Sequence, residues 1–284
     1  MLKQRVITAI VLLAILLPAL FYPSPEPFCA VVLLLIAAGG WEWGKLNGLG
    51  QGMSLVLAGV CLALCGASWW AGLLQQQLTW LWILAGSAWV LAGAWLIRSG
   101  VPGWPRVPKA VRLVGGIAVL CVAWLAAAQA RIAGINFLLS ILLLVWVADI
   151  FAYFAGRALG LRWTRVKLAP AISPGKSWEG VWGGMAGVVL VALAWVWADA
   201  HWQSAVPSFY SVLASRGLWL MLLAVLFMAA MSVVGDLVES LIKRSVGVKD
   251  SSGLLPGHGG VLDRVDALLP TLPLALMLTS LPTA

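Results

Sequence analysis

Residues 232–266 read SVVGDLVESLIKRSVGVKDSSGLLPGHGGVLDRVD and hold five of the chain's ten acidic residues. Long apolar runs flank this stretch on both sides. Acidic groups within a membrane are costly unless they are paired, hydrated or bound to a cation, so acids beside apolar runs mark functional positions. The stretch predicts a membrane protein whose polar chemistry is gathered near one boundary of the bilayer.

The composition of the whole chain agrees with a polytopic membrane protein. Hydrophobic residues make up 62% of the 284 residues, charged residues 10%, and the mean hydropathy is +1.00. Soluble domains carry about 25% charged residues, so a soluble enzyme is excluded. The net charge of +8 is spread over short loops, which favours an effect on membrane orientation and gives no sign of a nucleic-acid partner.

A membrane span needs roughly 20 mostly apolar residues, and nine such segments are expected in an all-α fold. The first begins close to the N-terminus and is read as a retained span, because no Ala-x-Ala-like cleavage site closes it. The expected spans are 6–22, 28–44, 53–71, 78–97, 113–130, 135–156, 178–198, 217–242 and 265–282.

The basic residues give this layout an orientation. With the N-terminus in the cytoplasm, 16 of the 18 Lys and Arg residues fall on the inner side and only Arg131 and Arg216 fall outside. Cytoplasmic loops are enriched in basic residues, so we expect a cytoplasmic N-terminus and an external C-terminus. The localisation expected is a bacterial-type cytoplasmic (inner) membrane, with the polar loops facing the cytoplasm.

The proline-rich connection 98–112 divides the chain into two expected regions. Residues 1–112 would form an N-terminal transmembrane region, and 113–284 a catalytic region with cytoplasmic loops 157–177 and 243–263. The four cysteines all lie in apolar runs, which favours small buried hydrophobic residues over metal ligands. Glu42, between Trp41 and Trp43 at the inner end of the second span, favours snorkelling or a hydrogen bond between helices.

The helix expected before residue 243 has one polar face. Ser232, Asp236, Glu239, Ser240 and Lys243 fall at offsets of 0, 4, 7, 8 and 11, which places them along one side. Oxygen ligands ending in a lysine suit a hard divalent cation that bridges phosphate groups. An interhelical hydrogen-bond network is the structural alternative.

A basic, glycine-dense segment follows this helix. It contains Lys243-Arg244, Lys249-Asp250 and the turn 256–260, whose glycines would let backbone N–H groups approach phosphate oxygens. His258 in this turn is a candidate base or phosphate contact.

Asp263 and Asp266 open the last expected span. Asp263 could cap that helix as an alternative to binding a metal, whereas Asp266 could complete a carboxylate cluster with Asp236.

A second polar stretch covers residues 149–180. Asp149, Tyr153 and Gly156 share a helix face, and a Ser173-Pro-Gly-Lys176-Ser loop follows. The Gly-Lys-Ser triplet is not a P-loop, because Pro170 stands where that motif needs a glycine. A second basic loop that binds anionic headgroups or nucleotide phosphates is the better interpretation.

The two stretches together resemble the signature of the phosphatidate cytidylyltransferases, also called CDP-diacylglycerol synthases. The resemblance is dense over 149–180 and 232–266, and in the first half it is carried mainly by hydropathy and Trp41-Glu42. It implies Mg²⁺-dependent transfer of the cytidylyl group of CTP to phosphatidic acid, with K⁺ as a second cation and a homodimeric protein. The site residues that it implies are Asp236, Asp263, Lys243 and His258 as catalytic, Lys176, Ser173, Arg244, Lys249, Ser240, Arg264 and Tyr153 as substrate-binding, and Asp236, Asp263, Asp250, Asp266 and Glu239 as metal ligands.

Two other classes of membrane protein are alternatives to a cytidylyltransferase. A cation-coupled transporter also places acids within spans, but it would spread them around a midplane cavity. Another phospholipid-headgroup transferase, of the CDP-alcohol type, would carry an Asp-Gly-x-x-Ala-Arg motif, which is missing from the sequence. A competent phosphate nucleophile needs charge neutralisation and in-line positioning, which acids, cations and Lys or Arg provide.

Overall fold

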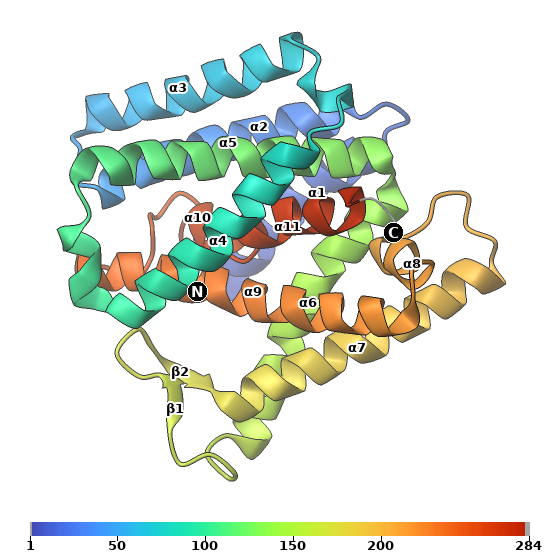
Figure 1. The fold of residues 1–284 in the computed structure, drawn as a ribbon. Coiled ribbons are helices and arrows are strands. Elements are labelled where there is room, and N and C mark those ends of the chain that lie inside the picture. The colour runs from blue at the N-terminus through green and yellow to red at the C-terminus, as the bar shows by residue number, and fades with distance from the viewer. Residues whose placement is uncertain (1, 282–284) are drawn as a thin grey trace.

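The computed structural model describes residues 2–281, and nearly all of them are helical (Figure 1). Leucine, alanine and valine dominate the runs between Gly and Pro residues, which favours long helices that end at those breaks. The α-helices are α1 (Leu2–Phe21), α2 (Glu26–Leu46), α3 (Gln51–Trp70), α4 (Thr79–Ser99), α5 (Lys109–Ala133), α6 (Ile135–Leu159), α7 (Trp178–His201), α8 (Phe209–Ala214), α9 (Leu218–Ser245), α10 (Leu262–Val265) and α11 (Leu268–Ser280).

Within residues 2–281, eight helices are long and apolar enough to cross a membrane. They are α1 to α7 and α9, and they correspond to the first eight expected spans. The all-α polytopic fold is confirmed.

The ninth expected span, 265–282, differs from a continuous helix. It begins at Val265, the last residue of α10, and continues after Asp266 and Ala267 as α11 of 13 residues. The helix α11 is roughly 20 Å long and too short to cross the hydrocarbon core by itself. Residue 282 lies outside the described residues.

The position of α11 against α9 explains this difference. A Cβ at Gly235 would lie 2.5 Å from the Asp266 carbonyl oxygen, so α11 begins part of the way along α9. At the other end of α11, Arg216 donates to the carbonyls of Leu278 and Thr279. The chain after α9 therefore returns into the bundle through a glycine-rich loop and α10, and α11 ends beside Arg216.

Arg131 and Arg216, the two basic residues expected outside, lie at the same end of the bundle. Arg131 donates to the carbonyls of Leu20 and Tyr22, at the end of α1, at 2.9 and 2.5 Å. Arg216 donates in a similar way to carbonyls at the end of α11. Cations stabilise the free carbonyls at helix C-termini. This role is local, and the orientation in the membrane stays a prediction.

The connection expected at 98–112 contains a 3₁₀ helix, η2 (Val101–Arg106), and leads directly into α5. The helix α5 packs against α2 and α3, and Trp124 Nε1 donates to the Cys29 carbonyl at 3.0 Å. One hydrophobic core therefore includes residues from both sides of position 112. The division into two regions stays a prediction.

The cysteines behave as small hydrophobic residues. Cys29, Cys61 and Cys65 are buried, Cys121 is half-buried, and all four are free thiols.

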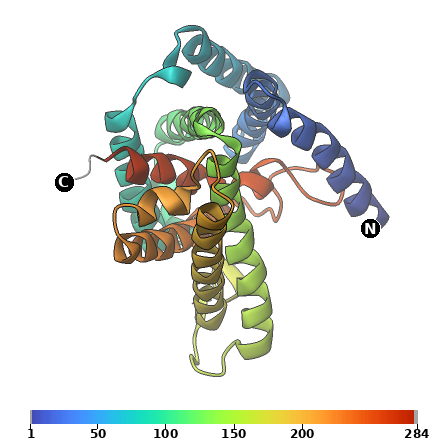
Figure 2. The ribbon, with the colours of Figure 1, turned by 90° about the vertical axis from the view of Figure 1, so that its right-hand side faces the viewer.

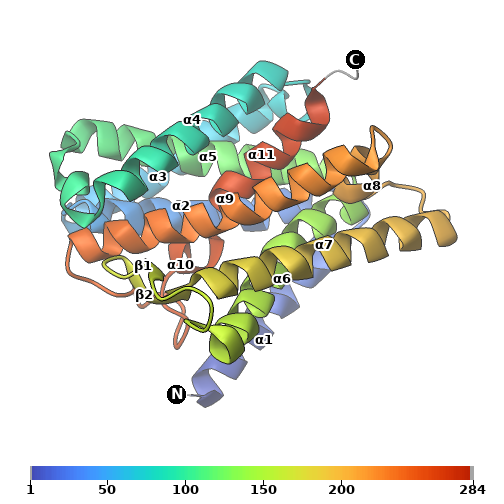
Figure 3. The ribbon, with the colours of Figure 1, turned by 60° about the horizontal axis from the view of Figure 1, so that its bottom comes forward.

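The helices α6 and α7 run side by side and extend away from the rest of the bundle (Figure 2). Their approach is close because α7 carries glycines where it faces α6. A Cβ at Gly184 would lie 2.7 Å from the Ala148 carbonyl oxygen, and one at Gly180 would lie 3.0 Å from that of Ala152. Between the two helices, β1 (Lys167–Ala169) and β2 (Ser173–Ser177) form an antiparallel hairpin beside the C-terminal end of α9 (Figure 3).

Candidate active site

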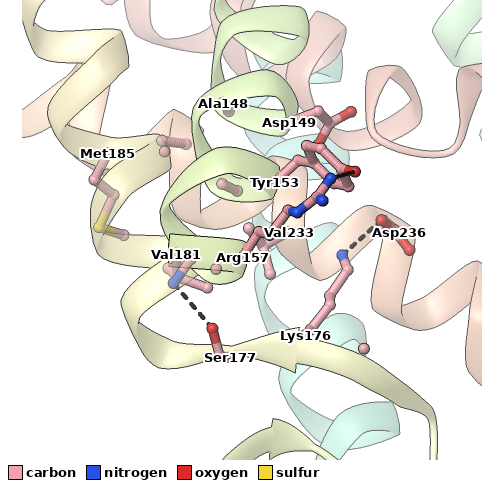
Figure 4. Close-up of a pocket in the computed structure, with 16 residues that line it drawn as sticks. Ala148, Asp149, Tyr153, Arg157, Lys176, Ser177, Val181, Met185, Val233 and Asp236 are labelled. Carbon is pink, nitrogen blue, oxygen red and sulfur yellow. Dashed lines mark hydrogen bonds and ion pairs between the residues drawn. The ribbon is translucent and has the colours of Figure 1, made fainter. Parts of the chain in front are cut away.

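A cavity of about 510 Å³ lies between α6, α7, α9 and β2 (Figure 4). Charged groups stand at one side of it and apolar groups at the other. We call it the acidic pocket. Its lining is Ala148, Asp149, Ala152, Tyr153, Gly156, Arg157, Gly175, Lys176, Ser177, Gly180, Val181, Gly184, Met185, Ala229, Val233 and Asp236.

Two predicted residues form an ion pair in the acidic pocket. Lys176 Nζ lies 2.5 Å from Asp236 Oδ2, and both side chains keep about a quarter of their surface exposed, at 25% and 29%. Ser240, one turn further along α9, donates to Asp236 Oδ1 at 3.2 Å. The lysine and the aspartate both line an open cavity, so a ligand can reach them.

The helix α6 supplies a second acid and a basic group to the same cavity. Asp149 lies close enough to Asp236 and Lys176 to interact with both electrostatically. Two turns further along, Arg157 Nη1 donates to the Tyr153 hydroxyl at 3.2 Å. Figure 4 shows Asp149 and Tyr153 on α6, facing the Lys176–Asp236 pair. The pocket thus offers two carboxylates and two cations at one mouth.

Local bonds fix the hairpin that carries Lys176. Ser177 caps α7 by accepting a hydrogen bond from Gly180 N at 3.2 Å, and Lys167 Nζ donates to the Pro174 carbonyl at 2.7 Å. The buried Glu179 carboxylate accepts from Thr164 N at 2.7 Å and from Thr164 Oγ1 at 2.8 Å. Capping at the start of a helix is a favourable use of a serine. The hairpin is therefore held at both sides before any ligand binds.

Asp266 approaches the acidic pocket from the turn between α10 and α11. It accepts a hydrogen bond from Ala267 N at 2.7 Å and interacts electrostatically with Asp236 and Asp149. The Asp266 carbonyl also lies against Gly235, the neighbour of Asp236. The carboxylate cluster of Asp266 with Asp236 stays a prediction.

The other predicted acids belong to a separate, buried network. Lys243 Nζ lies 2.5 Å from Glu239 Oε2 and 2.5 Å from Asp263 Oδ1, and the three side chains are 10%, 9% and 4% exposed. Asp263 Oδ2 accepts from Ser251 N, Ser251 Oγ and Gly260 N at 2.9, 2.9 and 2.7 Å. Every oxygen of Asp263 therefore has a protein partner.

These bonds control the ionisation of Asp263. Burial raises the pKa of this carboxyl group, but hydrogen bonds, first from Lys243 and then from groups that include Gly260 N and Ser251 N, more than offset it and hold the pKa at about 2. Hydrogen bonds to the charged form favour ionisation. Asp263 stays a carboxylate at neutral pH.

Glu42 completes this network, and the sequence alone predicts no site role for it. It is fully buried and accepts hydrogen bonds from the loop that follows α9. We call Glu42, Glu239, Lys243, Ser251 and Asp263 the loop anchor. The signal available in the sequence was an acid between two tryptophans at a span end, which does not by itself identify its partner.

The remaining predicted residues do not line the acidic pocket. Arg244 Nε donates to the Ile172 carbonyl at 3.4 Å, and Arg264 Nε donates to the His258 carbonyl at 3.0 Å. The Nδ1 atom of His258 is buried without a hydrogen-bond partner among the described residues. Lys249 and Asp250 are exposed, and Ser173 is half-buried at the start of β2.

A metal site would require several acidic side chains to surround one point. Among residues 2–281, no three His, Cys, Asp or Glu side chains are close enough to enclose a metal ion as they stand. Asp149 and Asp236 nevertheless both line the acidic pocket, and Asp266 interacts electrostatically with each of them. Oxygen is the ligand that Mg²⁺ prefers. The chemical type of the donors fits a magnesium ion.

The fold and the pocket define a multi-pass membrane protein with a charged cavity set among its helices. A sequence model of the cytidylyltransferase family matches residues 3–281. Among curated relatives, the phosphatidate cytidylyltransferase of Pseudomonas aeruginosa is 38% identical over 284 residues, covering 96% of this chain and 95% of the relative. That of Haemophilus influenzae is 36% identical over 292 residues, with 96% of each chain covered. That of Brucella suis is 35% identical over 276 residues, covering 94% of this chain and 89% of the relative.

The chain belongs to the cytidylyltransferase family. The family predicted from the two motif stretches is therefore confirmed, and the similarity extends over the first half of the chain as well.

Proposed function

We propose that this protein transfers the cytidylyl group of CTP to phosphatidic acid and so forms CDP-diacylglycerol and pyrophosphate. The observation that carries the proposal is the acidic pocket, with Lys176 and Asp236 paired at 2.5 Å beside an apolar cavity wall, in a member of this family. Phosphatidic acid has a charged headgroup and apolar chains, and the pocket offers both environments.

The chemistry requires charge neutralisation more than a protein nucleophile. An oxygen of the phosphatidate phosphate forms a bond to the α-phosphorus of CTP, and the bond from that phosphorus to the β-phosphate oxygen breaks, so pyrophosphate leaves. Both reactants are anions, and fixed cations and oriented donors lower the barrier to their approach. We assign this role to Lys176 and Arg157, with Tyr153 as a further hydrogen-bond donor to a phosphate.

The apolar wall has a separate role. Val181, Met185 and Val233 line the cavity beside the charged groups. We assign them to the glycerol and upper acyl region of the lipid, where they exclude water from the reacting phosphates. A water-poor site strengthens the pairing of phosphate with lysine and arginine.

Nucleotidyl transfer in this family depends on a metal, and we propose Mg²⁺, together with K⁺, as the ions. Asp236 and Asp266 would hold the magnesium, with Asp149 beside them. Asp263 and Glu239 would have to leave Lys243 in order to bind it, and Asp250 would have to approach from its exposed position. A bound divalent cation supplies neutralisation of phosphate charge and orients the two substrates.

Further phosphate contacts are proposed outside the pocket lining. We assign contacts with the phosphates of CTP, which would arrive from the predicted cytoplasmic side, to Lys249, Arg244, Arg264, His258 and Ser173. The same proposal places the protein in a bacterial inner membrane as a homodimer, with its pocket facing the cytoplasm.

The test is a transfer assay with purified protein, radiolabelled CTP, phosphatidic acid and Mg²⁺. We expect a labelled lipid product and released pyrophosphate, and no product when magnesium is removed with a chelator. Diacylglycerol, which lacks the phosphate nucleophile, serves as the control acceptor. Absence of labelled lipid with phosphatidic acid, in protein shown to be folded, would overturn the proposal.

A further inference from the structure

Glu42 lies at the inner end of α2 and is fully buried. Its two carboxylate oxygens accept hydrogen bonds from a loop more than 200 positions away in the sequence. The donors are Ser251 Oγ at 3.2 Å, Ser252 Oγ at 2.5 Å, Val261 N at 2.9 Å and Leu262 N at 2.8 Å. A buried carboxylate is costly without such partners, so these bonds fix the relation between α2 and the loop.

The backbone around Gly260 fits closely over Glu42. A Cβ at Gly260 would collide with Glu42 Oε1 and with Ser251 Oγ, so a side chain is excluded there. On the same face of α2, a Cβ at Gly39 would lie 3.3 Å from Leu262 Cδ2. The loop therefore rests directly on α2 at two points, and Glu42 is the polar one.

The bonds to Val261 and Leu262 lie at the start of α10. Asp263 lies in α10 directly after these two N–H groups, and Asp266 follows the end of α10. A carboxylate is a favourable partner for N–H groups at a helix start. Ser251 Oγ lies within hydrogen-bond distance of both Glu42 and Asp263. Glu42 thus contacts the segment that carries both aspartates, although it does not line the acidic pocket itself.

We propose that Glu42 is a positioning residue for the transfer reaction: it holds loop 251–262 and α10 so that Asp266 faces Asp236. This inference rests on the proposed function. Glu42 is supplied by α2, outside both motif stretches, so the N-terminal helices take part in shaping the site.

Glu42→Gln is the direct test, because it keeps the size of the side chain and changes its hydrogen bonding. The amide NH₂ is a donor and would face other donors among Ser252, Val261 and Leu262. Glu26→Gln is the matched control, since Glu26 is an exposed glutamate at the opposite end of the same helix.

Two readouts separate positioning from general stability. Residues that orient ligands typically cost roughly 10- to 100-fold in activity when changed, so we expect kcat of Glu42→Gln to fall by that factor. The KM for phosphatidic acid should stay within about twofold, because its proposed contacts lie on α6, α7, α9 and β2 and none lies in 251–262. Amide hydrogen exchange should accelerate about tenfold or more in 251–262 and stay unchanged in α6, α7 and α9, since local opening is independent of global unfolding.

The inference is overturned if exchange in 251–262 matches the wild type, or if exchange rises equally in all helices. It is also overturned if kcat of Glu42→Gln equals that of Glu26→Gln. Where Glu42→Gln does not accumulate as folded protein, Ser252→Ala removes one donor from the same carboxylate, and faster exchange limited to 251–262 is again expected. Unchanged exchange in that variant contradicts the inference. If the wild type itself shows no transfer, the proposed function fails, while the exchange measurement still decides whether Glu42 holds the loop.

Discussion

The acidic pocket and the loop anchor contain the same kinds of residue in opposite settings. In the acidic pocket, Lys176 and Asp236 pair beside an open cavity and keep about a quarter of their surface exposed. In the loop anchor, Lys243 is 10% exposed and is shared between Glu239 and Asp263. The first pair is accessible to a ligand, and the second is occupied by the protein.

The difference separates two uses of an acid in a membrane protein. An incompletely paired carboxylate beside a cavity can bind a cation or a substrate. The free-energy cost of placing its charge within the membrane is offset when that ligand binds. A carboxylate with all its oxygens bonded to the chain holds segments in place. Helix α9 contributes Asp236 to the acidic pocket and Glu239 and Lys243 to the loop anchor, so the loop anchor can position what the acidic pocket uses.

The largest expected effect is on the activity of Asp236→Asn. This change removes the charge that pairs with Lys176 and, under the proposed function, a magnesium ligand. We expect transfer to fall about 100-fold or more, as for other groups that stabilise developing charge. The measurement is the CTP-dependent transfer assay, with Glu26→Gln as control and with folding checked by thermal denaturation. Near-wild-type activity of folded Asp236→Asn would remove the acidic pocket from the reaction.

A large effect on stability is expected for Lys243→Met. The change leaves Glu239 and Asp263 as buried carboxylates without their common cation, and removal of one partner from a buried pair costs about 3–5 kcal/mol. Lys176→Met is the matched variant and should lower activity with little change in thermal stability, because both partners of the Lys176–Asp236 pair keep about a quarter of their surface exposed. Thermal denaturation of both variants in detergent tests this. Equal stability losses would show that the two regions are not different in kind.

A smaller effect is expected on the pH dependence of stability, through Asp263. The folded pKa of about 2 lies below the unfolded value near 3.9. The contribution of this carboxylate to the free energy of unfolding is therefore nearly complete above about pH 4, and it is lost as the pH falls through about 2. Acid unfolding of wild type and Asp263→Asn, followed by tryptophan fluorescence, should show a constant difference from pH 7 to about 5 that shrinks at lower pH. A difference that already shrinks between pH 7 and 5 would contradict this assignment.

Much of the fold follows from the sequence because span length and apolar content are strong signals. The eight long helices match eight expected spans. The ninth segment was harder to predict because hydropathy averages over 265–282 and does not register that α10 ends, the backbone turns at Asp266 and a short α11 begins. The packing of Asp266 against Gly235 is a tertiary contact that no local pattern encodes.

The lining of the acidic pocket was predictable only in part, and the site roles of the predicted residues stay predictions. The polar face of α9 placed Asp236, Ser240 and Lys243 together, and the Ser240–Asp236 hydrogen bond and the Lys176–Asp236 pair join residues that motifs had indicated. Helix periodicity could not show that Lys243 faces Asp263 while Asp236 faces the cavity. The connection of Glu42 to loop 251–262 spans more than 200 residues and depends on the packing of α2 against that loop.

The most direct test of the central claim is substrate protection of a single cysteine in the acidic pocket. Val233 lines the cavity and is half-buried, so Val233→Cys should react with a small thiol reagent. We expect CTP with Mg²⁺ and phosphatidic acid to slow its modification about tenfold, because occupancy of a site shields it in proportion to binding. Arg106→Cys, on the exposed 3₁₀ helix at the same end of the bundle, should react equally with and without substrates, and the wild type reports background from the native thiols. Unchanged modification of Val233→Cys at substrate concentrations that support transfer would contradict the placement of the reaction in this pocket.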